Sequence, residues 1–374
     1  MHTDSTTLRL IGRQLLRHPP RTARHLRWTL GMAALHVGLG ATLRAAFSAD
    51  DLLFPSWRRV EVKEPVFVLA AARSGTTFLH RLLALDDERF FTPSLYQTVL
   101  PSVSVARAAA TLAKLDSRLG APSARLLAKL EAQLFGGWSH IHPMGLAAPE
   151  EDEAIFVHTL VSPALYLLMP DFERLSRLSS PEELSAEAQD ALMNFYRDCL
   201  RRLLSTAPGE RTLLVKNVLS AGRVDALLET FPDLRVVSPL RHPYEAIPSL
   251  VSMFDSVWKA ILPDTERVDH QAFARIAMDY YRRSFELEQR LPSDHFVRMR
   301  YDDLVREPEA SVRDIYTRFG WHVSDDFASR LRSECERARD YKSEHHYRLE
   351  DYGLDRELIR RELAPVFERC GFDS

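Results

Sequence analysis

Short runs of apolar and β-branched residues recur along the chain, and a helical pattern follows each of them. The four clearest runs are VFVLAA at 66–71, TLLVKN at 212–217, LRVVSPL at 234–240 and HFVRMRY at 295–301. Runs of this length predict buried strands, and the periodic segments between them predict helices. Alternating strands and helices favour a central parallel sheet that is covered on both faces. We therefore expect an α/β fold of three layers, with helical insertions and an N-terminal helical arm.

The first residues of the chain follow a different pattern. Leu8, Ile11, Leu15 and Leu16 lie at helical spacing with arginines between them, as in an amphipathic helix. The apolar stretch 29–48 is interrupted by charged and polar residues, so no uninterrupted run reaches the roughly 20 apolar residues that span a bilayer. The arm can lie on an anionic membrane, or it can pack on the protein itself or on a second subunit, which would make a homodimer.

These patterns divide the chain into two parts of unequal size. Residues 1–60 form the basic, partly apolar helical arm, and residues 61–374 form a single α/β domain. Within that domain, residues 91–210 are largely helical and are interrupted by a loop rich in Gly and Pro, which predicts an insertion.

Composition and charge narrow the class of protein. The chain has 374 residues, of which 45% are hydrophobic, which excludes a disordered protein. Its 49 basic and 52 acidic residues give a net charge of −3, so no large basic excess supports nucleic-acid binding. Residues 1–48 hold seven arginines and one acidic residue, which suggests contact with an anionic surface. Three widely spaced cysteines form no metal or disulfide pattern, so we expect a reducing compartment, the cytoplasm.

The turn after the first predicted strand carries the chemistry of an anion site. Arg73, Ser74, Gly75, Thr76 and Thr77 lie between that strand and a helical pattern. Backbone N–H groups at a helix start bind oxyanions, and Gly allows a close approach. Arginine adds two parallel hydrogen bonds, and the hydroxyls add others. The alternative is an ordinary capped turn.

This loop differs from the P-loop of nucleotide triphosphatases. That motif requires GxxxxGK[ST], whereas the loop here reads AAARSGTT and lacks both the first Gly and the Lys. The segment FVLAAARSGTTFLHRLLALD instead resembles the 5′-phosphosulfate-binding loop of the sulfotransferase superfamily, in particular of bacterial and tyrosylprotein sulfotransferases. The resemblance implies a P-loop-like fold and the co-substrate 3′-phosphoadenosine 5′-phosphosulfate (PAPS), with no metal.

Other positions match the same superfamily. The family holds the 3′-phosphate of PAPS with an Arg at a strand end and a Ser eight residues later, which here are Arg241 and Ser249. Lys216 ends the second predicted strand, where the family places a Lys close to the transferred group. Tyr301 matches the family Tyr that contacts the adenine. The resemblance thus implies that Arg73 and Lys216 are catalytic. It also implies that the donor is bound by Arg73, Ser74, Gly75, Thr76, Thr77, Arg241, Ser249 and Tyr301.

The general base is where the sequence departs from the family. The acidic residue that tyrosylprotein sulfotransferases carry beyond the loop is replaced by Ser94. We rank His142 first and Glu151 second as candidates, because both lie in the loop SHIHPMGLAAPEEDE, which is similar to a segment of bacterial members. A charged first turn of the next helix explains the acidic residues equally well.

The sequence therefore predicts an enzyme that transfers a sulfuryl group from PAPS to a hydroxyl of a small-molecule or lipid-like acceptor, and residues 91–210 are expected on the acceptor side. We expect a cytoplasmic protein with peripheral contact to the inner face of the membrane through residues 1–48. Two alternatives remain open: a P-loop kinase-like phosphotransferase, and a non-catalytic nucleotide-binding scaffold at the membrane.

Overall fold

The fold is built on one parallel sheet. The computed structural model describes residues 5–17, 19–20, 22–71, 73–135, 145–167, 184–261, 269–338 and 347–372. Its sheet has five strands in the order β2-β3-β1-β4-β5, and all neighbouring pairs are parallel. The strands are β1 (Val66–Val68), β2 (Phe90–Phe91), β3 (Thr212–Lys216), β4 (Arg235–Leu240) and β5 (Phe296–Arg300). The predicted α/β fold with a parallel sheet is confirmed, and β2 is an additional edge strand.

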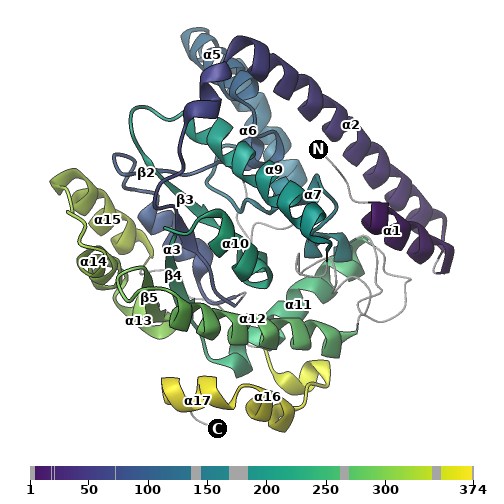
Figure 1. Ribbon diagram of the computed structural model, residues 1–374, viewed down its shortest axis with the longest axis vertical. Helices are drawn as coiled ribbons and strands as arrows, with labels where there is room; N and C mark the ends of the chain where they lie inside the picture. The colour runs from purple at the N-terminus through teal and green to yellow at the C-terminus, as the bar shows by residue number, and fades with distance from the viewer. Residues whose placement is uncertain are drawn as a thin grey trace.

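Helices cover both faces of the sheet and extend beyond it (Figure 1). The domain helices are α3 (Thr76–Leu83), α4 (Leu95–Val99), α5 (Val103–Arg118), α6 (Pro122–Phe135), α7 (Glu153–Val157), α9 (Ala186–Leu204), α10 (Val224–Thr230), α11 (Pro243–Ile261), α12 (His270–Arg290), α13 (Tyr301–Arg306), α14 (Pro308–Arg318), α15 (Asp325–Ala338), α16 (Arg356–Glu362) and α17 (Ala364–Cys370). Short 3₁₀ helices are η1 (Pro55–Arg59), η2 (Pro163–Leu167), η5 (Val218–Arg223) and η6 (Leu349–Tyr352).

Successive side chains of a strand point to opposite faces of the sheet, so the hydrophobic core has one part on each face. Val66 and Val68 of β1 point to a cluster formed with α3, α14 and α15, whereas Phe67 points to a cluster formed with α9, α10 and α12. Residues in a strand alternate between faces, so a strand this rich in apolar side chains must be covered on both. The central position of β1 places the loop that follows it in the middle of the carboxyl edge of the sheet.

The N-terminal arm consists of α1 (Ser5–Arg17) and α2 (Ala23–Leu53), which lie at the periphery (Figure 1). Ile11 and Leu15 pack against the core cluster around α11 and α12, whereas Leu8 and Leu16 are exposed. Among the residues that the structure describes, α2 is the one helix long and apolar enough, by length and composition, to cross a membrane. His36 and Arg44 interrupt its apolar stretch, but Val37, Leu39 and Leu43 between them keep its mean hydropathy high.

Candidate functional site

The loop after β1 turns sharply before α3. Arg73 and Gly75 both have a positive φ, of 68° and 84°. Such backbone is strained for a non-glycine residue and is typical of loops that present backbone to a ligand. A Cβ at Gly75 would lie 2.8 Å from a ring carbon of Tyr301, so only glycine fits between the loop and this ring. Ser74 and Thr76 of the same loop are buried.

The two predicted phosphate motifs meet at this loop. The Arg73 Nε donates a hydrogen bond to the Ser249 hydroxyl at 3.1 Å. The Arg241 guanidinium donates to the backbone carbonyl of Arg73 at 3.4 Å and lies over the Tyr301 ring, 4.7 Å from its centroid. Glu245 accepts a hydrogen bond from the Arg241 Nε at 2.9 Å. Two arginines thus lie side by side at the carboxyl edge of the sheet, where α/β proteins bind ligands.

Lys216 lies on the other side of the loop. It ends β3, which is parallel to β1, and its side chain is 1% exposed. Its ammonium donates to the Thr77 hydroxyl at 2.9 Å and forms ion pairs with Glu150 at 3.3 Å and Glu151 at 3.1 Å. Glu150 is buried, while the Glu151 side chain is 26% exposed. A buried ammonium held in this way is a fixed positive charge, and Glu151 beside it is accessible from outside.

The next two acidic residues point inward, into a buried network. Asn217 donates to Asp152 at 2.6 Å and to Glu153 at 2.8 Å, and Tyr196 donates to the other carboxylate oxygen of Asp152. Arg223 binds both carboxylate oxygens of Glu153 at 2.8 Å. Burial raises the pKa of Asp152 to about 7. All five side chains are buried. The network therefore holds Asp152 and Glu153 against Asn217, the residue that follows Lys216.

Of the two predicted candidates for the general base, only Glu151 lies in the described part of the chain. His142 lies outside the described residues, so its position relative to Lys216 stays a prediction. Glu151 is at the site, and so is Glu150, another acidic residue of the same candidate loop. The acidic run begins just before α7, as the alternative interpretation expected, yet only Glu153 lies in the first turn of that helix. The sequence analysis also did not identify Asn217 and Tyr196 as partners of the acidic segment. The one sequence feature that could have indicated such a role is the position of Asn217 directly after Lys216.

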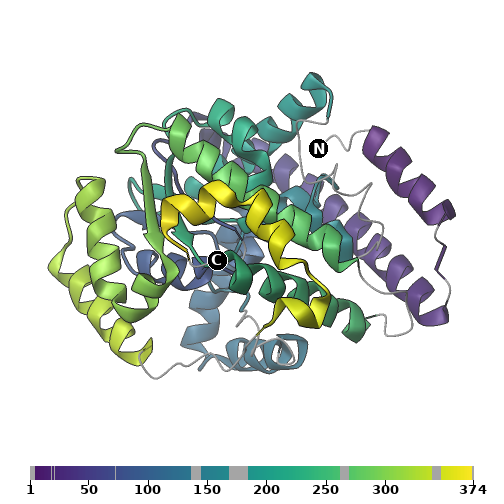
Figure 2. The ribbon, with the colours of Figure 1, turned by 90° about the horizontal axis from the view of Figure 1, so that it is seen from below.

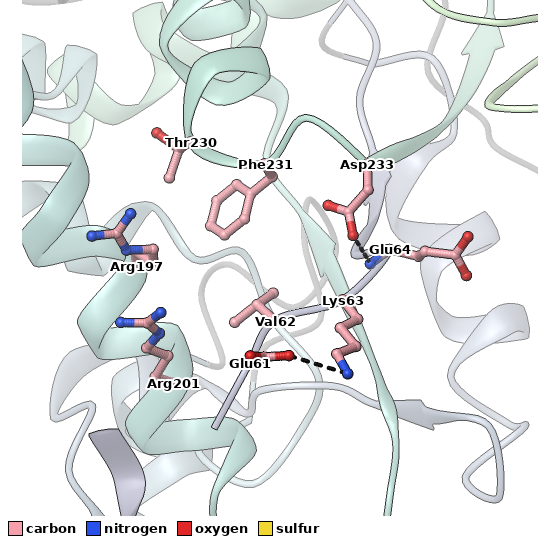
Figure 3. A pocket seen from close by; sticks show the side chains of 9 residues that line it. All are labelled: Glu61, Val62, Lys63, Glu64, Arg197, Arg201, Thr230, Phe231 and Asp233. Carbon is pink, nitrogen blue, oxygen red and sulfur yellow. Dashed lines mark hydrogen bonds and ion pairs between the residues drawn. The ribbon is translucent and has the colours of Figure 1, made fainter. Parts of the chain in front are cut away.

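A pocket at the opposite, amino edge of the sheet has a volume of about 560 Å³ (Figure 3). Its charged groups already have partners, since Lys63 pairs with Glu61 at 3.1 Å and Asp233 accepts from the Glu64 backbone at 2.7 Å. The predicted site residues do not line it. The cluster at the carboxyl edge is therefore the better candidate for chemistry.

Comparison with known proteins identifies the family to which this arrangement belongs. A family model described as the sulfotransferase family matches residues 65–325, which is well over half of the chain. The omega-hydroxy-beta-dihydromenaquinone-9 sulfotransferase Stf3 of Mycobacterium bovis is 24% identical over 319 residues, which cover 83% of this chain and 75% of the relative. The protein of the same name from Mycobacterium tuberculosis gives the same values.

Solved structures show the same fold. Sulfotransferase STF9 of Mycobacterium avium superposes with a TM-score of 0.78 at 22% identity, over 98% of this chain and 92% of that one. Sulfotransferase STF1 of M. tuberculosis H37Rv gives a TM-score of 0.68 at 21% identity, over 96% and 91%. The family assignment favours the predicted sulfuryl transfer over the kinase and scaffold alternatives. The chain belongs to the sulfotransferase family and is an enzyme that transfers a sulfuryl group to a hydroxyl.

Proposed function

We propose that the sulfuryl donor is PAPS and that the acceptor is a hydrophobic, lipid-like alcohol. The observation that carries the first part is the convergence of Arg73, Arg241, Ser249 and Lys216 on one loop at the carboxyl edge of the sheet. These residues fit a ligand with separate anionic groups, because Arg241 lies on one side of the loop and Lys216 on the other. PAPS supplies a sulfuryl group already bonded to a phosphate, which is a stable leaving group.

The residues divide into a binding side and a reacting side. Arg241 and Ser249 are assigned to the 3′-phosphate, and Tyr301, held between the loop and Arg241, is assigned to the adenine. Arg73 and the start of α3, including Ser74, Gly75, Thr76 and Thr77, are assigned to the 5′-phosphosulfate end. Planar guanidinium groups and backbone N–H groups at a helix start suit phosphate and sulfate oxygens.

On the reacting side, Lys216 is assigned to the charge that develops on the leaving group, since an ammonium fixed in a buried site stabilises such charge more strongly than one in water. Glu151 is assigned as general base, because its carboxylate is the exposed one of the pair on Lys216 and an acceptor hydroxyl can reach it. Glu150, which is buried, holds the ammonium in place.

Two observations support a lipid-like acceptor: the substrate named for a relative, and the apolar residues near the site. Stf3 is named as a sulfotransferase of a hydroxylated menaquinone, which is a long apolar molecule with a terminal hydroxyl. In this chain the acidic segment leads into α7, which contacts α4, and three of the five residues of α4 are Leu95, Tyr96 and Val99. We also propose that the enzyme works in the cytoplasm, in peripheral contact with the inner face of the membrane through residues 1–48.

The test is a transfer assay with sulfur-labelled PAPS and two acceptor pools, a total lipid extract and a water-soluble metabolite extract. We expect a labelled product that partitions into organic solvent and forms only from the lipid pool. A product from the water-soluble pool alone would contradict the acceptor class. Thermal stabilisation by ATP and not by 3′-phosphoadenosine 5′-phosphate would contradict the donor.

A further inference from the structure

The helical hairpin of α5 and α6 extends away from the body of the protein. Nearly every residue from 110 to 130 is exposed, with Asp116 and Ala121 the exceptions. The hairpin is nevertheless well formed, because the Asp116 carboxylate accepts from the backbone N–H groups of Ser123 and Ala124 at 2.8 and 2.9 Å and so caps the start of α6. A defined hairpin with so little contact to its own chain presents a surface to something else.

That surface is apolar. Leu112, Leu115 and Leu119 follow one face of α5 and are 65%, 49% and 77% exposed. On α6 the corresponding exposed residues are Leu126, Leu127 and Leu130. Leucines at i, i+3 and i+4 spacing normally mark the buried face of a helix. Here that face lies in solvent, which makes it a contact surface for an apolar partner.

The arm adds to the same surface. Of the exposed large hydrophobic residues in the described part of the chain, all but Val305 lie on α1, α2, α5 and α6 or, in the case of Leu119, directly after α5. Along α2, Leu26, Leu30 and Val37 lie within one face of the helix and are exposed. Helix α5 contacts α2, and α6 contacts α5, so these three helices form one connected region, while α1 packs through Ile11 and Leu15 on the core cluster around α11 and α12. Figures 1 and 2 show α1 and α2 on the side of the molecule away from α14 and α15.

The charge of this region indicates the partner. The four helices carry eleven basic and four acidic residues, although the chain as a whole has a net charge of −3. The acidic residues have partners within the protein. Asp50 accepts from Ser104 and pairs with Arg202, and Asp116 caps α6 as described. Glu131 accepts from the Leu146 backbone at 2.7 Å. Exposed leucines among arginines and lysines match an anionic bilayer surface, where apolar side chains enter the interface and basic ones bind headgroups.

We propose that the α5–α6 hairpin, together with α1 and α2, docks the enzyme on an anionic membrane and sets its distance from the bilayer. The Glu131 contact ties the base of α6 to the segment that continues to Glu150 and Glu151, the carboxylates on Lys216. The docked hairpin would thus lie next to the acceptor side of the site. The inference deepens the proposed function, since it explains how an apolar acceptor is reached, but the docking itself needs neither donor nor acceptor.

The experiment measures binding of the full chain to vesicles by co-sedimentation, without donor or acceptor. One set of vesicles is phosphatidylcholine alone, and the other also contains phosphatidylglycerol. We expect binding to the second set that weakens with salt, and a loss of at least about tenfold in Leu119→Glu/Leu126→Glu. The control is Val305→Glu, which places one such negative charge on an exposed apolar residue of α13 and should leave binding unchanged.

Three results would overturn the proposal: no preference for anionic vesicles, an equal loss in the Val305→Glu control, or unchanged vesicle binding in the double variant. A second copy of the chain is the competing occupant. Light scattering in solution tests it, because a wild-type dimer that the double variant converts to a monomer with full vesicle binding would assign the leucines to subunit contact. Thermal stabilisation by 3′-phosphoadenosine 5′-phosphate, measured in each variant, verifies the fold and tests the donor site separately.

Discussion

Replacing Lys216 by Met removes the ammonium and keeps most of the side-chain volume. If Lys216 stabilises the leaving group, kcat should fall by about 100-fold or more, which is the scale for loss of one preorganised donor to developing charge. The same change affects folding. It leaves the Glu150 carboxylate buried without the ammonium that lies 3.3 Å away, and loss of one partner of a buried ion pair costs about 3–5 kcal/mol.

A second substitution separates these two effects. Lys216→Met leaves the buried Glu150 carboxylate without its partner, and Glu150→Gln removes that unpaired charge. The double variant should therefore recover most of the free energy of unfolding. Its turnover should stay about as low as that of Lys216→Met, because the ammonium is still absent. Urea denaturation reports the first quantity, and a saturating transfer assay reports the second.

Two results would contradict this role of Lys216. Wild-type turnover in Lys216→Met would remove this residue from the chemistry. Turnover that returns together with stability in the double variant would show that the loss came from misfolding, and that the lysine serves only to neutralise the acidic segment.

Three further changes probe the loop and the buried network. Gly75→Ala should weaken binding of 3′-phosphoadenosine 5′-phosphate by tenfold or more in calorimetry, since a positive φ and a 2.8 Å approach to Tyr301 leave no room for a Cβ. Ser249→Ala should weaken the same binding about threefold to tenfold, because the Arg73 Nε loses its acceptor. Tyr196→Phe should lower the free energy of unfolding by about 2 kcal/mol at pH 8 and by less at pH 5.

The sign of that pH dependence comes from Asp152. Its pKa of about 7 in the fold lies above the ordinary value of 3.8, so the folded protein retains a proton that the unfolded chain has lost, and stability falls as pH rises from about 4 to 7. Tyr196 supports the charged form, and its hydroxyl is therefore worth more at pH 8. Equal costs at the two pH values would refute this role. Tyr316→Phe is the control, since Tyr316 is also buried and donates to an aspartate, Asp86, at 2.5 Å, and neither residue belongs to the network around Asp152.

The sequence predicted those parts of the site that depend on spacing along the chain. A strand fixes where its last residue lies, so Lys216 and Arg241 could be placed at the carboxyl edge, and Ser249 could be placed on the helix that follows. Strand β2 has only two residues, Phe90–Phe91, and so carries too short a pattern to be detected. A run of four acids has no periodicity, which is why the outward direction of Glu151 and the inward direction of Asp152 and Glu153 could not be predicted.

The leucines of α5 and α6 illustrate a different limit. Their spacing is the spacing of a core face, which normally indicates packing against the protein itself. Only the positions of the neighbouring elements show that nothing in the described part of the chain covers them. Periodicity predicts that a helix has an apolar side, but it does not predict whether the partner of that side is the protein itself or a membrane.

The pairing of one ammonium with two carboxylates makes a final prediction about Glu151. In the resting arrangement Lys216 is more than neutralised, which works against an anionic donor. When Glu151 takes the acceptor proton it becomes neutral, and the lysine charge is then available to the leaving group. Glu151→Gln imitates that neutral state without being able to accept a proton. It should lower kcat about 100-fold or more and tighten binding of 3′-phosphoadenosine 5′-phosphate roughly fivefold, or about 1 kcal/mol. Weaker binding in this variant would show that Glu151 holds the lysine in place and does not act as the base.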